Sequence, residues 1–186
     1  MKSCLRITGV GGQGAITAGH LLGTAAVLYD HKEAVVTEGY SPYITGGWSR
    51  ADVVISDAPV DYPMVTKLDG LVTMYQDGLD SNLGLLKHGS VVLVEKSLVN
   101  PSSAKGREVL LVPAAEAAQS LGRKVLTNIV LLGALTAVLP LVSMESLKTA
   151  VTTRFPKAAE LNVKALDTGF SLGNRLTRKE EGGIPA

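Results

Sequence analysis

Residues 9–14 constrain the fold of this chain more than any other segment. They read Gly-Val-Gly-Gly-Gln-Gly between an apolar run and a helix-like run, and Gly9, Gly11 and Gly14 complete the pattern G-x-G-x-x-G. A strand that enters such a turn and leaves as a helix directs backbone N–H groups and the positive end of the helix dipole at one point. The segment therefore predicts an α/β domain with an anion site at its first turn. We expect Gly11 and Gly14 to take conformations or close contacts that a branched side chain does not tolerate.

Apolar runs and helical spacing continue this alternation along the chain. Strands are expected at residues 5–8, 33–38, 52–56, 70–75, 91–94 and 109–112. Helices are expected at residues 14–30, 79–87, 114–121, 127–139, 143–154 and 157–172, and the segment 39–49 is expected to be a loop. The pattern predicts a three-layer Rossmann-like domain with a mostly parallel sheet, right-handed crossovers and a helical C-terminal third. We expect one domain over residues 1–175 and a flexible tail over residues 176–186.

Composition excludes several classes of function. The net charge of +1 and the 4% aromatic content disfavour nucleic-acid and membrane-surface partners. The single cysteine, Cys4, allows no intrachain disulfide and cannot hold an iron–sulfur cluster that needs four thiolates. The three histidines are scattered without metal-ligand spacing. No leader is recognisable at the N-terminus, so we expect a cytoplasmic protein, and the uncharged run 125–142 is interpreted as a buried helix.

Residues that could carry chemistry are few. Glu38 lies where a dinucleotide fold places the acid that binds a ribose hydroxyl. His20 falls inside the first helix and is expected to pack against the sheet. The segment 39–50 concentrates aromatic residues, which indicates contact with a partner or ligand; a packed loop with buried rings is the alternative. The sequence shows no catalytic set and no G-x-S-x-G elbow, so we predict no catalytic residue on this chain.

Two landmarks resemble one family. The string from Gly9 to Leu22, with Thr17-Ala18-Gly19 after the glycines, is similar to the opening of the gamma subunit of 2-oxoacid:ferredoxin oxidoreductases. The segment Tyr40-Ser41-Pro42, the pair Gly46-Gly47 and the run 49–56 resemble the family's second loop and following strand. Many members carry a glutamate and an arginine before the paired glycines. Here Ile44-Thr45 occupy those positions and the arginine comes later, as Arg50, so no role tied to the earlier arginine is carried over.

The resemblance implies a subunit of an enzyme that converts a 2-oxoacid and coenzyme A to an acyl-CoA and carbon dioxide while reducing ferredoxin, with 2-oxoglutarate or a related acid as substrate. Thiamine diphosphate, [4Fe-4S] clusters and coenzyme A are expected in the assembled enzyme, and no cofactor or metal on this chain. The partners would be alpha and beta subunits, with a ferredoxin-like delta subunit as an optional addition, and the isolated chain could form a homodimer. Candidate ligand or interface residues of the glycine loop are Gly9, Gly11, Gly12, Gln13, Gly14 and Thr17. Candidate interface residues of the second loop are Tyr40, Tyr43, Gly46, Gly47, Trp48 and Arg50.

Two other functions stay open at this point. Glu38 and the glycine pattern favour a self-sufficient oxidoreductase that binds NAD(P) or a flavin. A nucleotide-binding or purely structural module is the third hypothesis, because a fold does not imply a function.

Overall fold

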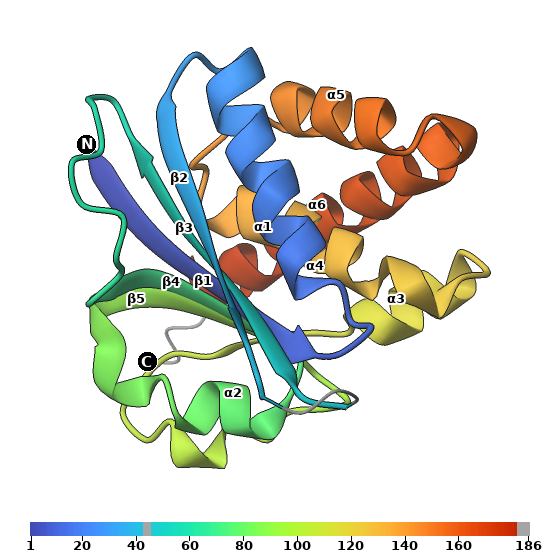
Figure 1. Ribbon diagram of the computed structural model, residues 1–186. Helices are drawn as coiled ribbons and strands as arrows, with labels where there is room; N and C mark the ends of the chain where they lie inside the picture. Colours follow the sequence, from blue (N-terminus) through green and yellow to red (C-terminus); the bar gives the residue numbers. More distant parts are fainter. Residues whose placement is uncertain (43–45, 182–186) are drawn as a thin grey trace.

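A computed structural model describes residues 1–42 and 46–181, with side chains described up to residue 178. It contains one six-stranded sheet in the order β2-β3-β1-β4-β5-β6 (Figure 1). The strands are β1 (Lys2–Val10), β2 (Glu33–Tyr40), β3 (Trp48–Ser56), β4 (Leu68–Thr73), β5 (Leu86–Glu95) and β6 (Leu110–Val112). The helices are α1 (Ala15–Thr24), α2 (Gln76–Asp80), α3 (Ala114–Ser120), α4 (Thr127–Val138), α5 (Met144–Arg154) and α6 (Ala159–Glu181).

The sheet is mostly parallel, as predicted, but one strand reverses its direction. β1, β4, β5 and β6 pair in parallel, whereas β3 lies antiparallel between β1 and β2. The expected loop at 39–49 is therefore wrong at both ends, because β2 continues to Tyr40 and β3 begins at Trp48. The crossover expected between these two strands is also wrong. Residues 41–47 are too few to return the chain to a parallel start, which takes about a dozen residues or more.

Most of the predicted helices are confirmed. The first helix is α1, which continues as one π-helical turn over Ala25–Tyr29. The helix expected at 79–87 is wrong: α2 ends at Asp80, a 3₁₀ turn covers Leu83–Leu85, and β5 begins at Leu86, which pairs with Leu68. The last helix is longer than expected, since α6 runs to Glu181. The proposed boundary between domain and tail at residue 176 stays a prediction.

Two hydrophobic cores of unequal size hold the layers together. The larger core packs α1, α3, α4, α5 and α6 against one face of the sheet. The smaller core lies on the other face and is built from β4, α2, β5 and the segment that follows β5. Because it draws no residue from β2 or β3, the second layer covers only part of its face.

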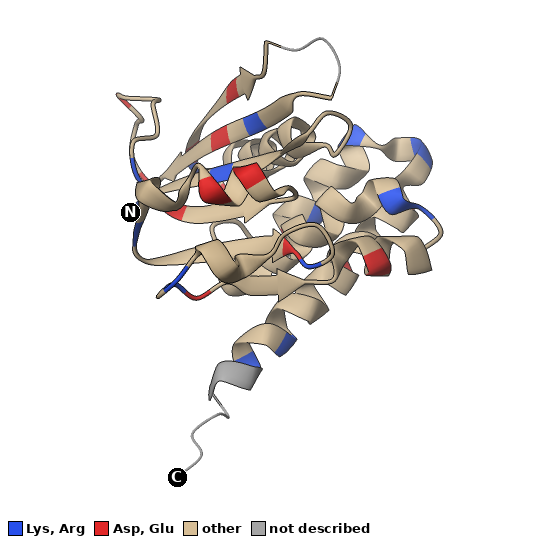
Figure 2. Cartoon of the chain, turned by 90° about the horizontal axis from the view of Figure 1, so that it is seen from below, with Lys and Arg blue, Asp and Glu red and all other residues tan. Residues whose placement is uncertain are grey.

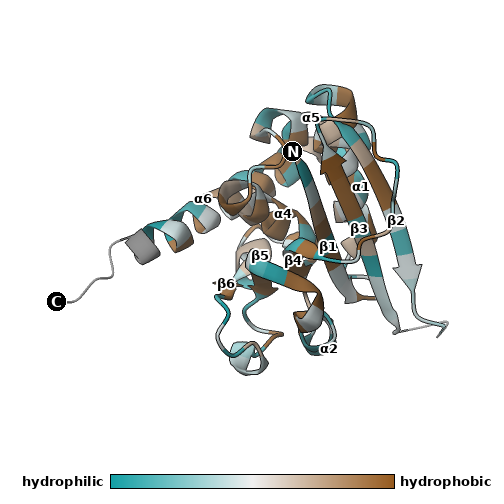
Figure 3. Ribbon diagram, turned by 90° about the vertical axis from the view of Figure 1, so that its left-hand side faces the viewer, coloured by the Kyte–Doolittle hydropathy of each residue, from teal (hydrophilic) through white to brown (hydrophobic). Residues whose placement is uncertain are grey.

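The distribution of charged and apolar residues agrees with the expectations from the composition. Charged residues of both signs are scattered rather than gathered into one patch (Figure 2). Brown, apolar segments run through the sheet and α4, whereas α6 projects from the body toward its C-terminal end (Figure 3). The central part of the uncharged run at 125–142 forms the buried helix α4, Thr127–Val138, as predicted, whereas Val125 is exposed. Among the described helices none is long and apolar enough to span a membrane.

Helices α4 and α6 pack closely against each other because glycines on each helix face the backbone of the other helix. A Cβ added at Gly169 would overlap the carbonyl of Val130, and one added at Gly133 would overlap the carbonyl of Leu166. A methyl group at either position forces the two helices apart, and overpacking of this kind costs about 1–3 kcal/mol.

We expect Gly169→Ala to lower the free energy of unfolding by about 2 kcal/mol or more, because the obstacle is backbone and cannot rotate away. Gly84→Ala is the matched control, since its Cβ would meet nothing within 4 Å. Urea unfolding of both variants measures the difference. Equal midpoints for the two variants would contradict the close crossing.

Candidate functional site

The glycine loop between β1 and α1 is closed by the side chain of Gln13. Its Oε1 accepts from the N–H of Val10 at 2.8 Å, and its Nε2 donates to the carbonyl of Met74 at 3.1 Å. The backbone N–H of Gln13 donates to the carbonyl of Val10 at 3.1 Å. A Cβ at Gly9 would lie 2.8 Å from Gln13 Oε1, so Gly9 makes room for this amide. Gln13 thus ties the loop to the end of β1 and to Met74, the residue that follows β4.

Two of the loop glycines have backbone angles that favour glycine. Gly12 has φ +87° and Gly14 has φ +75°, both in the left-handed region. Gly14 also touches α4, because Asn128 Nδ2 donates to its carbonyl at 3.1 Å and a Cβ there would overlap the Asn128 amide. Gly11 differs from the expectation. Its φ is not in the left-handed region, and an added Cβ would lie 3.7 Å from Gly47 O, an ordinary contact.

The hairpin tip meets the glycine loop. The N–H of Gly11 donates to the carbonyl of Gly47 at 2.8 Å, and the N–H of Ser41 donates to the carbonyl of Trp48 at 2.9 Å. The first bond brings the two segments singled out by the sequence into direct contact, and the second closes the hairpin itself. The amides of Gly11 and Gln13 are consequently used inside the protein and are not directed at a bound anion.

A cavity of about 750 Å³ opens beside the two segments. Its wall is completed by the start of α4 and by the corner between α5 and α6, so three helices, α1, α4 and α6, begin at its edge. Of the described residues that line it, Arg123 alone carries a charge. The lining comprises Gly11, Gly12, Gly14, Ala15, Ile16, Thr17, Tyr40, Ser41, Gly46, Gly47, Trp48, Ser49, Arg123, Val125, Leu126, Asn128, Ile129, Phe155, Ala158, Leu161 and Asn162.

The structure thus gathers most of the predicted site residues at one cavity. Gly9, Gln13 and Arg50 are outside its lining, and Tyr43 lies outside the described residues. Tyr40 is 60% exposed and Trp48 is 37% exposed, so the alternative of a loop with buried rings does not hold for these two residues. Arg123, Asn128 and Phe155 were missed, because nothing in the sequence pattern relates them to the glycine loop.

Glu38 does not occupy a ribose-binding position. In a dinucleotide fold the acid ends the strand next to the first strand, but here β3 separates β2 from β1. Both carboxylate oxygens of Glu38 are engaged, one by the hydroxyl of Tyr40 and the other by His20 Nε2. These two hydrogen bonds lower the pKa of Glu38. The hydrogen bond between Tyr40 and Glu38 also raises the pKa of the Tyr40 hydroxyl. The prediction that His20 packs against the sheet is wrong, because its side chain is 56% exposed.

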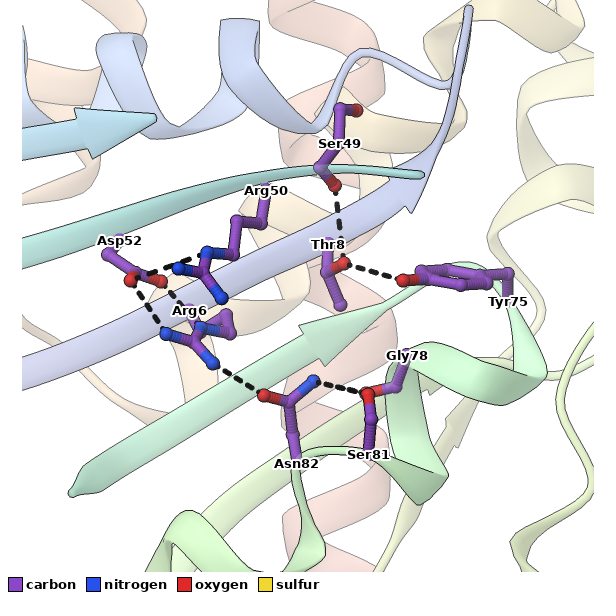
Figure 4. A network of polar contacts seen from close by, with 9 residues as sticks. All are labelled: Arg6, Thr8, Ser49, Arg50, Asp52, Tyr75, Gly78, Ser81 and Asn82. Carbon is purple, nitrogen blue, oxygen red and sulfur yellow. Dashed lines mark hydrogen bonds and ion pairs between the residues drawn. The ribbon is translucent and has the colours of Figure 1, made fainter. Parts of the chain in front are cut away.

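A buried polar network lies on the opposite face of the sheet (Figure 4). Arg6 donates from Nε and Nη2 to the two oxygens of Asp52 at 2.6 and 2.7 Å, and from Nη1 to Asn82 Oδ1 at 2.6 Å. Asn82 in turn donates to the carbonyl of Gly78 at 2.7 Å. Arg6 and Asp52 are each 5% exposed. Over residues 1–42 and 46–178, whose side chains the structure describes, no cluster of three or more metal-binding side chains occurs.

The two glycines of the loop should respond differently to substitution. We expect Gly14→Val to lower the free energy of unfolding by about 1–3 kcal/mol, because its φ is left-handed and its Cβ meets Asn128. Gly11→Ala should unfold like the wild type, since neither obstacle is present there. Thermal melts of the two variants are the measurement. A Gly14→Val melt that matches the wild type would disprove the geometry of the turn.

Comparisons with known proteins agree with this architecture. The chain is 41% identical over 180 residues to the 2-oxoglutarate synthase subunit KorC of Methanocaldococcus jannaschii, covering 95% of this chain and 96% of the relative. The crystal structure of a keto/oxoacid ferredoxin oxidoreductase gamma subunit from Geobacter sulfurreducens has a TM-score of 0.81 at 35% identity, covering 95% and 98% of the two chains. A 2-oxoglutarate:ferredoxin oxidoreductase from Magnetococcus marinus shares the fold, with a TM-score of 0.85 at 21% identity over 94% of this chain and 31% of that chain. The sequence pattern of the pyruvate ferredoxin/flavodoxin oxidoreductase family matches residues 4–172, and the chain belongs to that family.

Proposed function

We propose that the chain is the gamma subunit of a multisubunit 2-oxoglutarate:ferredoxin oxidoreductase. The observation that carries this proposal is the nearly complete mutual coverage with a stand-alone subunit of a 2-oxoglutarate synthase at 41% identity. The enzyme would convert 2-oxoglutarate, coenzyme A and oxidised ferredoxin to succinyl-CoA, carbon dioxide and reduced ferredoxin. Its partners would be alpha and beta subunits, with an optional ferredoxin-like delta subunit, in the cytoplasm.

The cofactors of such an enzyme do not fit this chain. A [4Fe-4S] cluster needs four thiolates, and the sequence holds one cysteine. Thiamine diphosphate supplies the electron sink for carbanion chemistry, and we place it and the clusters on the partner subunits. This chain then contributes binding surface and no reaction step.

We assign the cavity beside the glycine loop to the approach of coenzyme A. Its volume is within the range of small-molecule sites, about 300–1,000 Å³. The N-termini of α1, α4 and α6 direct positive dipole ends toward its wall, and Arg123 adds a full positive charge, which suits the phosphates of coenzyme A. Gln13 and Asn128 would act by holding the loop in place. The engaged Glu38 and the inserted β3 disfavour the alternative of an NAD(P)- or flavin-binding enzyme.

The subunit assignment is tested by purification. We expect the tagged chain from its native host to retain subunits that carry thiamine diphosphate and iron. The same chain expressed alone should be colourless, because the ligands for those groups are missing. Metal analysis and the visible absorption spectrum measure this. Stoichiometric iron or flavin on the isolated chain, as monomer or homodimer, would contradict the assignment.

The cavity assignment is tested by kinetics of the assembled enzyme. We expect Arg123→Ala to raise the KM for coenzyme A about 10-fold or more and to leave the KM for 2-oxoglutarate unchanged. A change of this size corresponds to the loss of one charge-assisted hydrogen bond. Lys124→Ala is the matched control, because this neighbouring cation lies outside the cavity lining. If the two variants share one KM for coenzyme A, the cavity has another role.

A further inference from the structure

The hairpin formed by β2 and β3 has two faces with different surroundings. Ala51 and Val53 face α1, where a Cβ at Gly19 would meet both side chains. Alternation along the strand places Trp48, Arg50 and Asp52 on the opposite face. The smaller hydrophobic core does not extend over this outer face. We propose that Arg50 and Trp48 form a docking surface for an aspartate or glutamate side chain of a partner subunit, an inference that rests on the proposed function.

Arg50 is held in place by three neighbours. Its guanidinium lies over the Trp48 ring, 5.7 Å from the centroid, and its Nε lies 3.8 Å from Asp52 Oδ2. Gly39, its direct partner across the hairpin, leaves the space that it crosses, since a Cβ there would lie 2.8 Å from Arg50 Nε. The side chain is still 38% exposed. The cation is therefore oriented before any partner arrives, which reduces the entropy lost on binding.

The charges around Arg50 do not balance among the side chains that the structure describes. Both oxygens of Asp52 accept from Arg6 at 2.6 and 2.7 Å, whereas the 3.8 Å separation from Arg50 is too long for a hydrogen bond. Two cations thus share one carboxylate, as Figure 4 shows. In the described part of the chain the guanidinium of Arg50 makes no hydrogen bond. One further carboxylate would balance the charge and fill the planar fork of donors, the geometry that arginine provides for such a group.

The occupant that fits is a protein side chain rather than a small anion. Arg50 does not line the 750 Å³ cavity, and small ligands bind in concave sites. An exposed tryptophan next to an arginine is instead the composition of protein interfaces, where these residues carry much of the binding energy. Trp48 would pack against the apolar part of the partner surface while Arg50 binds the carboxylate.

The first test measures assembly with the partner subunits. We expect Arg50→Ala and Trp48→Ala each to raise the dissociation constant about 30-fold or more, and Arg50→Glu to raise it further by repulsion. Gly39→Ala keeps the charge but displaces the guanidinium, so it should also weaken binding. Arg154→Ala is the control, because Arg154 likewise lies over an aromatic ring, 5.3 Å from the Phe155 centroid, on another element. Melting curves of the isolated variants report whether each remains folded.

The second test identifies the facing group. In the Arg50→Lys variant a carbodiimide joins the introduced amine to a carboxylate in contact with it, and mass spectrometry locates the product. A crosslink to an acidic residue of a partner subunit supports the proposal. A crosslink confined to Asp52 of the same chain would show an internal structural pair and would overturn it.

The outcomes separate this inference from the proposed function. If the wild-type chain retains no oxidoreductase subunits, both fail. If it assembles and the folded Arg50 variants bind as tightly as Arg154→Ala, the docking surface alone is refuted. Unchanged assembly with a raised KM for 2-oxoglutarate or coenzyme A would instead assign Arg50 to a small anion, against the proposal.

Discussion

The ion pair between Arg6 and Asp52 is the interaction on which the rest of the structure depends. The two residues lie directly opposite each other on β1 and β3, buried, with two hydrogen bonds between them. Removing one partner of a buried pair costs about 3–5 kcal/mol, because the other charge is left without compensation. A shift of one residue would carry either side chain to the apolar face. The pair therefore fixes the register of β3, and with it the contact of Gly47 with Gly11.

The inserted strand changes what the glycine motif can do. In a dinucleotide fold the loop amides face a pyrophosphate and the acid of the second strand binds the ribose. Here Gly47 and Val10 accept from two of those amides, and β3 stands between β1 and Glu38. Three residues of the motif, Gly11, Gly12 and Gly14, instead line a cavity that the hairpin tip and the C-terminal helices complete. Gln13, which the dinucleotide pattern leaves unspecified, maintains this arrangement through hydrogen bonds to Val10 of β1 and to Met74 directly after β4.

Local patterns could predict the elements but not their mutual placement. The run Val53-Val54-Ile55 and the small residues of α1 identify a buried strand and a helix packed closely on the sheet. An apolar run looks alike in both directions, so the reversal of β3 could not be predicted from it. The pairing of Arg6 with Asp52 spans 46 residues, and the contact of Asn128 with Gly14 spans 114. Both depend on tertiary packing, as does the exposure of His20 between the buried Gly19 and Leu21.

The β2–β3 hairpin therefore contributes both to the cavity and to the outer face of the sheet. Tyr40, Gly47 and Trp48 all line the cavity, whereas Arg50, which lies over the Trp48 ring, is outside its lining. The N–H of Ser41 donates to the carbonyl of Trp48, so the residue that presents the outer ring also closes the tip above the cavity. Each nitrogen of the Arg6 guanidinium donates a hydrogen bond inside the chain, whereas the Arg50 guanidinium donates none within the part of the chain that the structure describes. A carboxylate bound at Arg50 would complete the charge balance of the network that joins β1 to β3.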